Sequence, residues 1–384
     1  MTYDFDVIVV GARVAGAPTA MLLARQGHRV LLMDRATMPS DTMSTHAITR
    51  SGVVQLRRWG LETEVAGLTA PVREIVLGFG DQRIRFEVKA EHGVDTFYAP
   101  RRQYLDAMLV GAAEDEGATF VGGSRMTDLI WSGDEVQGVV AGGEAITARM
   151  VIGADGVWSK MASLVRAPAL HWHEATNAIS YAYFEGIDAP GFWFQFTPGV
   201  NAGLINTSDD QVCVFAGRPT EDFDRFRGDP DVEFDRLLAV AGPDLYEMVG
   251  QGRRVSSFRG TPGLPGFIRR PWGPGWALVG DAGYTKDPIS AHGISDAFRD
   301  AELCARAVDR ALADPSIATD AMHGYQRERD RHSWTVLRQS QALARYEWGP
   351  EEASRRMRAI SNVVNEESAA LSSLPEWSPV GVPA

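Results

Sequence analysis

The chain has little cysteine and lacks any uninterrupted apolar run of about 18 residues. We therefore predict no transmembrane helix. Cys213 and Cys304 are the only cysteines, lie far apart in apolar contexts and lack CxxC spacing, which favours buried free thiols in a reducing cytosol. The beginning of the chain carries Asp4 and Asp6 instead of a basic stretch, so we expect no signal peptide. Together these absences predict a cytoplasmic protein with no stable membrane association.

An excess of positive charge is also missing, because 38 Lys and Arg face 50 Asp and Glu. The net charge of −12 argues against nucleic acid as a partner. The GxSxG turn of hydrolases and the GxxxxGK loop of ATPases do not occur. His173-Glu174 begins like the zinc motif HExxH, but Asn177 stands where the second histidine is needed. The sequence therefore predicts no metal site.

What the chain does contain is a strand, turn, helix, strand pattern over residues 4–35. A glycine turn from Gly11 to Gly16 opens the helix, and Asp34 ends the second strand, which is the arrangement of a dinucleotide site. The helix N-terminus offers N–H groups and a positive dipole end to a pyrophosphate, and Asp34 can accept from a ribose hydroxyl. Arg13 replaces the usual middle glycine. Its side chain either reaches a phosphate or lies in solvent.

Two further glycine motifs each follow an apolar strand. They are Gly153-Ala154-Asp155-Gly156 and Gly280-Asp281-Ala282-Gly283. With the first turn, they resemble in order and spacing the flavoprotein monooxygenases of the para-hydroxybenzoate hydroxylase type over about residues 4–345. The resemblance implies an α/β fold: a Rossmann-like FAD-binding domain with an inserted antiparallel β-sheet substrate domain and C-terminal helices.

The resemblance also implies roles for residues of the site, with FAD as the cofactor. Asp281 would bond the ribityl chain, Pro288 would lie beside the flavin ring, and the helix that begins near Gly293 would face the ring with its N-terminus. Ala291 stands where the family usually has glycine. Asp155 would link the FAD domain to the site of NADH or NADPH, a transient reductant because no second GxGxxG exists. The implied cofactor-binding residues are Gly11, Arg13, Ala15, Gly16, Asp34, Arg35, Arg50, Arg102, Asp155, Gly280, Asp281, Pro288, Gly293 and Ile294.

The middle of the chain is rich in aromatic strands. We assign residues 1–70, 98–170 and 270–330 to the FAD-binding domain, 71–97 and 171–269 to the substrate domain, and 331–384 to a C-terminal helical segment. The pattern predicts a hairpin over 73–88 and helices over 231–249, 293–313 and 323–371, and indicates a loose tail. Alternation places Trp193 and Gln195 on one face of their strand and the neighbouring phenylalanines on the other. The candidate substrate-binding residues are Tyr181, Tyr183, Trp193, Gln195 and Phe215.

The resemblance implies NAD(P)H-dependent hydroxylation, or epoxidation, of an apolar or aromatic small molecule by O₂ through a flavin C4a-hydroperoxide. His46 and His292 are candidate acid–base residues, with a structural role as the favoured alternative. Two other functions stay open: an FAD-dependent reductase of the geranylgeranyl reductase type, and a non-catalytic binding protein with a flavoprotein fold. The W-x-W-x-I-P signature of flavin halogenases is absent. We expect a monomer or a homodimer.

Overall fold

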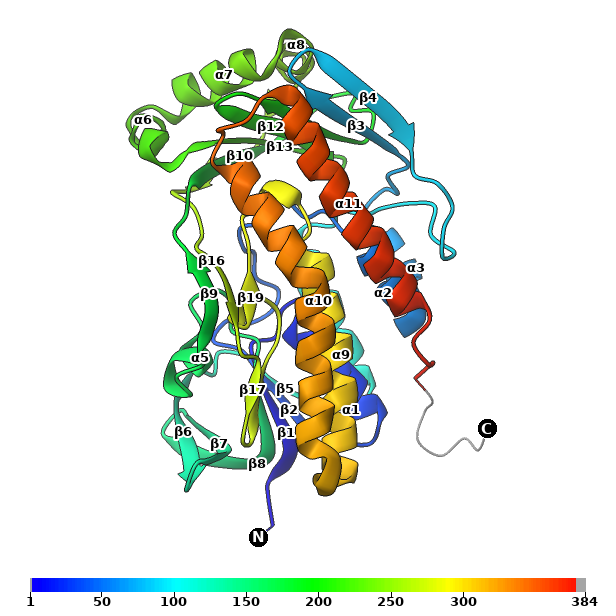
Figure 1. Cartoon of the computed structure of the whole chain (residues 1–384), viewed down its shortest axis with the longest axis vertical. Coiled ribbons are helices and arrows are strands. Elements are labelled where there is room, and N and C mark those ends of the chain that lie inside the picture. The colour runs from blue at the N-terminus through cyan, green and yellow to red at the C-terminus, as the bar shows by residue number, and fades with distance from the viewer. Residues whose placement is uncertain (1, 378–384) are drawn as a thin grey trace.

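The computed structural model describes residues 2–377 and contains a mainly parallel sheet built from distant parts of the chain (Figure 1). The central strand β1 pairs in parallel with β2 and β8, and these pair in turn with β5 and β18. The short strand β17 extends the β18 edge. The bounds are β1 (Phe5–Val10), β2 (Val30–Met33), β5 (Thr119–Val121), β8 (Glu144–Gly153), β17 (Trp272–Gly273) and β18 (Trp276–Leu278).

Both faces of this sheet are covered, which explains why its strands are continuous apolar runs. Val7 and Val9 face a layer of helices, whereas Ile8 and Val10 face an antiparallel hairpin. The helical layer contains α1 (Gly16–Arg25), α4 (Arg102–Asp115) and α9 (Gly293–Ala313). The hairpin consists of β6 (Met126–Ser132) and β7 (Glu135–Ala141), next to α5 (Lys160–Leu164). The predicted helix over 293–313 is confirmed.

A second, mostly antiparallel sheet lies at the other end of the molecule (Figure 1). The predicted hairpin over 73–88 is confirmed, and it joins this sheet through a parallel pairing of β3 with β11. The hairpin over 74–87 therefore shares one sheet with strands of residues 177–261. The strands are β3 (Glu74–Phe79), β4 (Gln82–Glu87), β10 (Asn177–Glu185), β11 (Phe192–Thr197), β12 (Val200–Asn206), β13 (Val212–Pro219), β14 (Arg253–Arg254) and β15 (Arg259–Thr261).

Helices cover the outer face of the second sheet, and here the sequence prediction is partly wrong. The helix expected over 231–249 is two helices, because Gly242 adopts a φ of 152° and Pro243 starts a new helix. These helices are α7 (Pro230–Ala241) and α8 (Pro243–Gly250), preceded by α6 (Phe223–Gly228). A small third sheet contains β9 (Ala169–His173), β16 (Gly266–Arg269) and β19 (Tyr284–Thr285).

The C-terminal region also differs from the prediction, because the stretch over 323–371 is two helices joined at residues 345–349. They are α10 (Ala318–Ala344) and α11 (Pro350–Ser372). The first lies along α9, so the predicted boundary at 330 falls inside a helix of the FAD-binding part. The second crosses back to α2 (Arg50–Trp59), which is followed by α3 (Glu62–Ala66).

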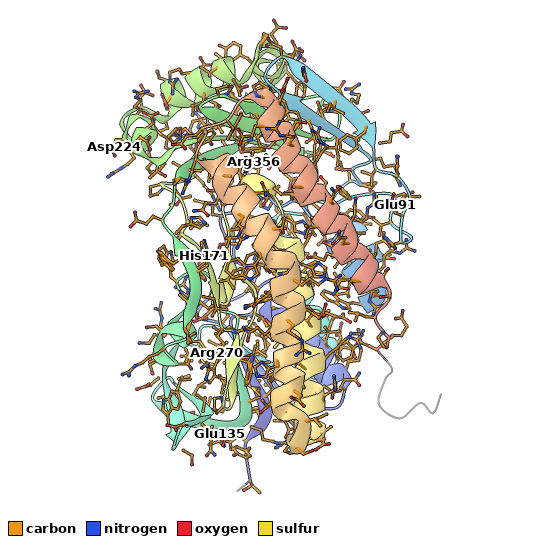
Figure 2. All side chains as sticks on the ribbon, in the orientation of Figure 1. Glu91, Glu135, His171, Asp224, Arg270 and Arg356 are labelled. Atoms are coloured by element: carbon orange, nitrogen blue, oxygen red, sulfur yellow. The ribbon has the colours of Figure 1, made fainter. Side chains whose placement is uncertain are left out.

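The expected loose tail begins with an anchored tryptophan, since Trp377 Nε1 donates to Glu302 Oε1 at 2.9 Å. Residues 378–384 lie outside the described part. Charged side chains are spread around the outside, as Glu135 and Asp224 illustrate in Figure 2. No helix within residues 2–377 is long and apolar enough to span a bilayer.

Candidate functional site

The three glycine motifs meet at one edge of the parallel sheet. Each directly follows the carboxyl end of a parallel strand: β1 leads to Gly11, β8 to Asp155 and β18 to Asp281. Asp34 follows β2 at the same edge. Ligands of open α/β sheets bind outside the carboxyl ends of the strands. The structure therefore gathers the predicted cofactor residues where a dinucleotide would bind.

The glycine turn is held by close backbone contacts that exclude side chains. A Cβ on Gly16 would lie 1.7 Å from the Gly11 carbonyl oxygen, and one on Gly11 would lie 2.3 Å from the Ala154 oxygen. Asp34 fixes the turn from the next strand, since its carboxylate accepts from the Ala12 and Ala36 N–H groups at 2.8 Å each. Ala15 packs against the third motif, where a Cβ on Gly280 would lie 2.8 Å from the Ala15 Cβ.

Arg13 takes neither of the two positions that the sequence suggested. Its Nη1 donates to Asp106 Oδ2 at 2.8 Å, and its Nη2 donates to Ser40 Oγ at 2.9 Å. Arg102 Nε donates to the other oxygen of the same buried carboxylate at 2.9 Å. Two guanidinium groups on one carboxylate leave a net positive charge beside the turn. That charge favours the binding of a pyrophosphate, although the Arg13 side chain is held by Asp106 and Ser40 and does not extend toward it.

At the other end of the site, Asp281 is exposed to water although protein surrounds it. The surrounding protein reduces the hydration of the carboxylate, which raises the pKa of Asp281 to about 6. The charges of Lys286 and Arg102 oppose this increase. No side-chain hydrogen bond reaches its carboxylate from any described residue. Gly293, the first residue of α9, is also exposed, and a Cβ there would meet nothing within 4 Å. A recessed acceptor and an open helix N-terminus fit the ribityl chain and ring of a bound FAD.

The loop between Asp281 and α9 is fixed by a buried acid. Asp287 Oδ1 accepts from Asn177 Nδ2 at 2.9 Å and from the Ile289 N–H at 3.0 Å. Burial raises the pKa of Asp287 to about 7, although these bonds favour its charged form. Tyr346 donates to the amide oxygen of Asn177 at 2.7 Å, so the loop is tied to the segment after α10. Pro288, predicted to lie beside the ring, is the residue that this arrangement positions.

His46 lies buried against the second sheet. Its Nε2 is 2.7 Å from the Tyr183 hydroxyl, and its ring stacks on the tyrosine ring at 5.8 Å. Burial lowers the pKa of His46 to about 3, with further contributions from nearby arginines including Arg102 and Arg101. The imidazole is therefore neutral near pH 7. His46 Nδ1 is buried without a hydrogen-bond partner among residues 2–377.

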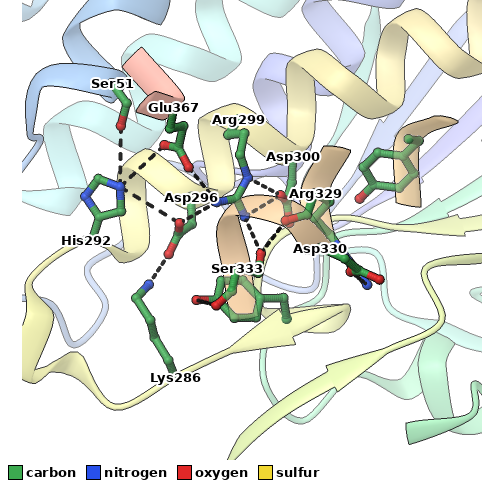
Figure 3. A network of polar contacts seen from close by, with 12 residues as sticks. Ser51, Lys286, His292, Asp296, Arg299, Asp300, Arg329, Asp330, Ser333 and Glu367 are labelled. Atoms are coloured by element: carbon green, nitrogen blue, oxygen red, sulfur yellow. Dashed lines mark hydrogen bonds and ion pairs between the residues drawn. The ribbon is translucent and has the colours of Figure 1, made fainter. Parts of the chain in front are cut away.

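His292 belongs to a buried network of charges at the start of α9 (Figure 3). Its Nδ1 lies 2.7 Å from Thr49 Oγ1, and its Nε2 lies 3.4 Å from Glu367 Oε1 of α11. Arg299 Nη1 donates to both Asp296 and Glu367 at 2.8 Å. Burial alone would raise the pKa of Glu367, but Arg299 and His292 hold it below its usual value.

This network brings together three groups with the chemistry of metal ligands. Ligand atoms of His292, Asp296 and Glu367 all lie within 4.8 Å of one another. However, Lys286 contacts Asp296 and Arg299 contacts both acids, so cationic side chains already neutralise the carboxylates. A metal ion would have to displace these charges. We interpret the cluster as an ion-pair network.

Four of the predicted cofactor residues have other contacts or positions in the structure. Arg50 Nη1 donates to the Lys89 and Val94 carbonyls at 2.8 and 2.9 Å, so this nitrogen holds a loop. Asp155 accepts from Ser159 Oγ at 2.5 Å and the Met161 N–H at 3.0 Å, which are contacts of a cap on α5. Arg35 is exposed directly after Asp34, and Ile294 is buried in the helical core.

The predicted substrate residues are divided between the two faces of the second sheet. Tyr181, Tyr183 and Phe215 share the inner apolar cluster, against which Ala291 packs. Trp193 belongs to the outer cluster under α7, and Gln195 Nε2 donates to the Gly80 carbonyl at 2.8 Å. The five residues therefore cannot line one pocket. Tyr181, Tyr183 and Phe215 lie on the face opposite Trp193.

Sequence reasoning missed several residues of this inner face. Leu77 and Phe194 are only partly buried there, and they also pack near Ile289 of the loop before α9. They stand in one register across β3 and β11. Asp106 was also missed as the shared partner of two arginines. Only the i, i+4 spacing from Arg102 could have indicated it.

Comparison with known proteins agrees with an FAD-binding fold. The FAD binding domain family matches residues 4–219, which is more than half of the chain. A kynurenine 3-monooxygenase of Salinispora arenicola is 27% identical over 365 residues, 85% of this chain and 76% of that protein. A menaquinone reductase of Mycobacterium tuberculosis is 27% identical over 353 residues, 82% and 80% of the two chains. The crystal structure of PqsL, a probable FAD-dependent monooxygenase from Pseudomonas aeruginosa, is similar with a TM-score of 0.77 at 22% identity, covering 93% and 99%.

The fold and the site thus define an FAD-binding oxidoreductase. Within that class, the chain belongs to the FAD-dependent monooxygenase family of the para-hydroxybenzoate hydroxylase type. The family and the fold class predicted from the three glycine motifs are confirmed.

Proposed function

We propose that this protein is an NAD(P)H-dependent monooxygenase that hydroxylates an apolar or aromatic small molecule. The observation that carries the proposal is the position of Ala291. It lies two residues before Gly293, whose open helix N-terminus fits the flavin ring, and it packs against the inner aromatic face of the second sheet. A substrate on that face would therefore border the ring.

When bound, FAD would supply the hydride acceptance and the O₂ chemistry. The residues of this chain would do the rest. Asp281 would accept from the ribityl hydroxyls, and the N-terminal N–H groups of α9 would stabilise negative charge on the ring. The apolar cluster around Tyr181 and Phe215 would exclude water from the reacting centre. Neutral His46 holds the Tyr183 hydroxyl and carries no charge into this apolar wall.

The test is to measure O₂ uptake and NADH or NADPH oxidation by the FAD-loaded protein with a panel of phenols and other flat apolar compounds. We expect O₂ and NAD(P)H to be used in equal amounts and the product to gain one oxygen atom. Turnover without O₂, with a quinone or an alkene reduced instead, would overturn the monooxygenase and support the reductase. A protein that cannot bind FAD would support the binding-protein alternative.

Two adjacent residues of β11 give a matched pair of variants. Phe194→Leu changes the inner face, and Trp193→Phe changes the outer face under α7. We expect Phe194→Leu to change the KM for the organic substrate or the choice of substrate. Trp193→Phe should leave both unchanged. Equal effects of the two variants would contradict the inner face as the substrate wall.

A further inference from the structure

One part of the inner face is strongly basic. Arg101 and Arg259 both bind the same oxygen of Asp41, with Nη2 to Oδ2 distances of 3.2 and 3.0 Å. Among the described residues, Asp41 is the only carboxylate in ion-pair contact with either arginine. Two guanidinium groups on one carboxylate leave one unbalanced positive charge.

This arginine pair belongs to the same aromatic face as the proposed substrate wall. Arg101 lies over the Tyr183 ring, with Cζ 4.3 Å from the ring centroid. Arg259 stands opposite Tyr181 in the register of β15 and β10. Both tyrosines belong to the apolar cluster against which Ala291 packs. A flat ligand that touched these rings could reach the arginines with one end.

The pair also has unused hydrogen-bonding capacity. Arg101 Nε is buried and finds no acceptor anywhere in residues 2–377, and Nδ1 of His46, whose ring stacks on Tyr183, is buried and unpartnered in the same stretch. A buried N–H without an acceptor is costly, so it points to a group that binds there. Asp41 supplies one oxygen to both arginines, while its other oxygen accepts from the Thr42 N–H at 2.9 Å.

We propose that Arg101 and Arg259 form an anion site for a carboxylate or a phosphate on the incoming ligand, and that Asp41 occupies this site in the resting protein. The inference rests on the proposed function, because it describes how the same site would recognise its ligand. The anion could belong to the organic substrate or to the reductant NAD(P)H. An arriving oxyanion would take the place of the Asp41 carboxylate between the two guanidinium groups, and bidentate arginine contacts suit either source.

The site predicts that neutralising Asp41 strengthens anion binding and that removing an arginine weakens it. The probes are benzoate, its uncharged analogue benzamide, and NADH, titrated calorimetrically into the FAD-loaded protein. We expect Arg101→Gln and Arg259→Gln each to weaken benzoate or NADH about tenfold, and Asp41→Asn to strengthen the same probe about tenfold. Benzamide should bind all variants alike. The matched control is Arg253→Gln, at an exposed ion pair on the edge of the same sheet.

The pattern of effects identifies the source of the anion. A loss confined to benzoate assigns the site to the substrate, and a loss confined to NADH assigns it to the nucleotide phosphates. Unchanged binding of both probes in the two arginine variants would overturn the proposal, as would failure of the wild-type protein to bind either. Because Arg101 is the N-cap residue of α4, Arg259→Gln on the short strand β15 provides the test if Arg101→Gln fails to fold.

The same measurements separate this inference from the proposed function. Oxygenation by a wild-type protein whose anion binding ignores both arginines would contradict the anion site alone. Arginine-dependent binding in a protein that never oxygenates any compound would contradict the proposed function alone.

Discussion

The two ends of the candidate FAD site differ in how completely the protein satisfies its own polar groups. At the glycine turn, Asp34 accepts from two backbone N–H groups, and Asp106 binds both Arg13 and Arg102. At the opposite end, Asp281 is exposed within a recess, and Gly293 faces open space. The polar groups of the glycine turn are therefore satisfied without a ligand. At the ring end, by which we mean Asp281 and Gly293, polar groups remain open to a ligand.

Substitutions should therefore act differently at the two ends of the site. Close contacts and buried charges make the turn part of the folded core, so changes there should lower the free energy of unfolding of the protein without ligand. Groups at the ring end contribute little to the fold in their open state. Changes there should act mainly on the affinity for FAD.

The largest expected effect is at the turn. Gly16→Ala would place a Cβ 1.7 Å from the Gly11 carbonyl oxygen, and backbone cannot move away cheaply. We expect the free energy of unfolding to fall by more than about 4 kcal/mol, or the protein to fail to fold, as measured by chemical denaturation. The matched variant is Gly293→Ala, where the new methyl group meets nothing within 4 Å. If the two variants were equally stable, the contrast between the ends would be wrong.

Asp106→Asn should have the next largest effect. It leaves Arg13 and Arg102 together without a counter-charge beside the turn, and breaking a buried ion pair typically costs about 3 kcal/mol. Thermal and urea unfolding of the protein without FAD will measure the loss. Arg227→Gln, at an exposed ion pair on α6, serves as the control and should change little. Loss of FAD affinity with unchanged stability would place Asp106 among the ligand contacts instead.

The same contrast explains what the sequence could predict. The turn end follows from local rules: glycine at close approaches, apolar strands buried on both faces, and an acid at a strand end. The helix over 293–313 follows from one amphipathic period and was predicted with its observed bounds. Pro243 should have divided the helix expected over 231–249, because proline cannot donate the N–H that continues a helix.

The partners of Arg13 could not be predicted, because Asp106 lies 93 positions away and only the packing of α1 on α4 brings them together. Alternation likewise shows which residues share a face of a strand, but it does not show which face α7 covers. For that reason the prediction grouped Trp193 with Tyr181 and Phe215, which lie on the opposite face. The recess at Asp281 also needs the structure, since accessibility depends on elements distant in the chain.

His46, buried against Tyr183 of the second sheet, allows a test through pH. Its pKa is about 3 in the folded protein and about 6.5 in the unfolded chain, so the unfolded chain takes up the proton first as the pH falls. Stability should therefore decrease from about pH 6.5 downward, by about 2 kcal/mol at pH 5. His46→Asn should lack this part of the pH dependence in urea unfolding. His46 and the exposed His92 both have a positive φ. His92→Asn is therefore the matched control and should keep the full pH dependence.

Asp281→Asn should have the smallest effect on the fold and a selective effect on FAD. We expect FAD to bind about tenfold more weakly at pH 7.5, because a charged acceptor for the ribityl hydroxyls is lost, while the unfolding midpoint without FAD stays nearly constant. The pH dependence gives the sharper test. Asp281 without ligand has a pKa of about 6, and hydroxyl donors would favour its charged form.

Binding of FAD near pH 6 should therefore release a proton, and the affinity of the wild-type protein should fall as the pH drops through about 6. Calorimetric titrations in buffers of different ionisation enthalpy measure the released proton directly, without any turnover. The Asn variant should release none at this pH and should bind FAD with an affinity that stays flat across the same range. Proton release that persisted in Asp281→Asn would assign the titration to another group. The buried Asp287 of the same loop would then be the first candidate. FAD binding would then change the protonation of Asp287 and not of Asp281, and the ring end of the site would be assigned to the loop that carries Asp287.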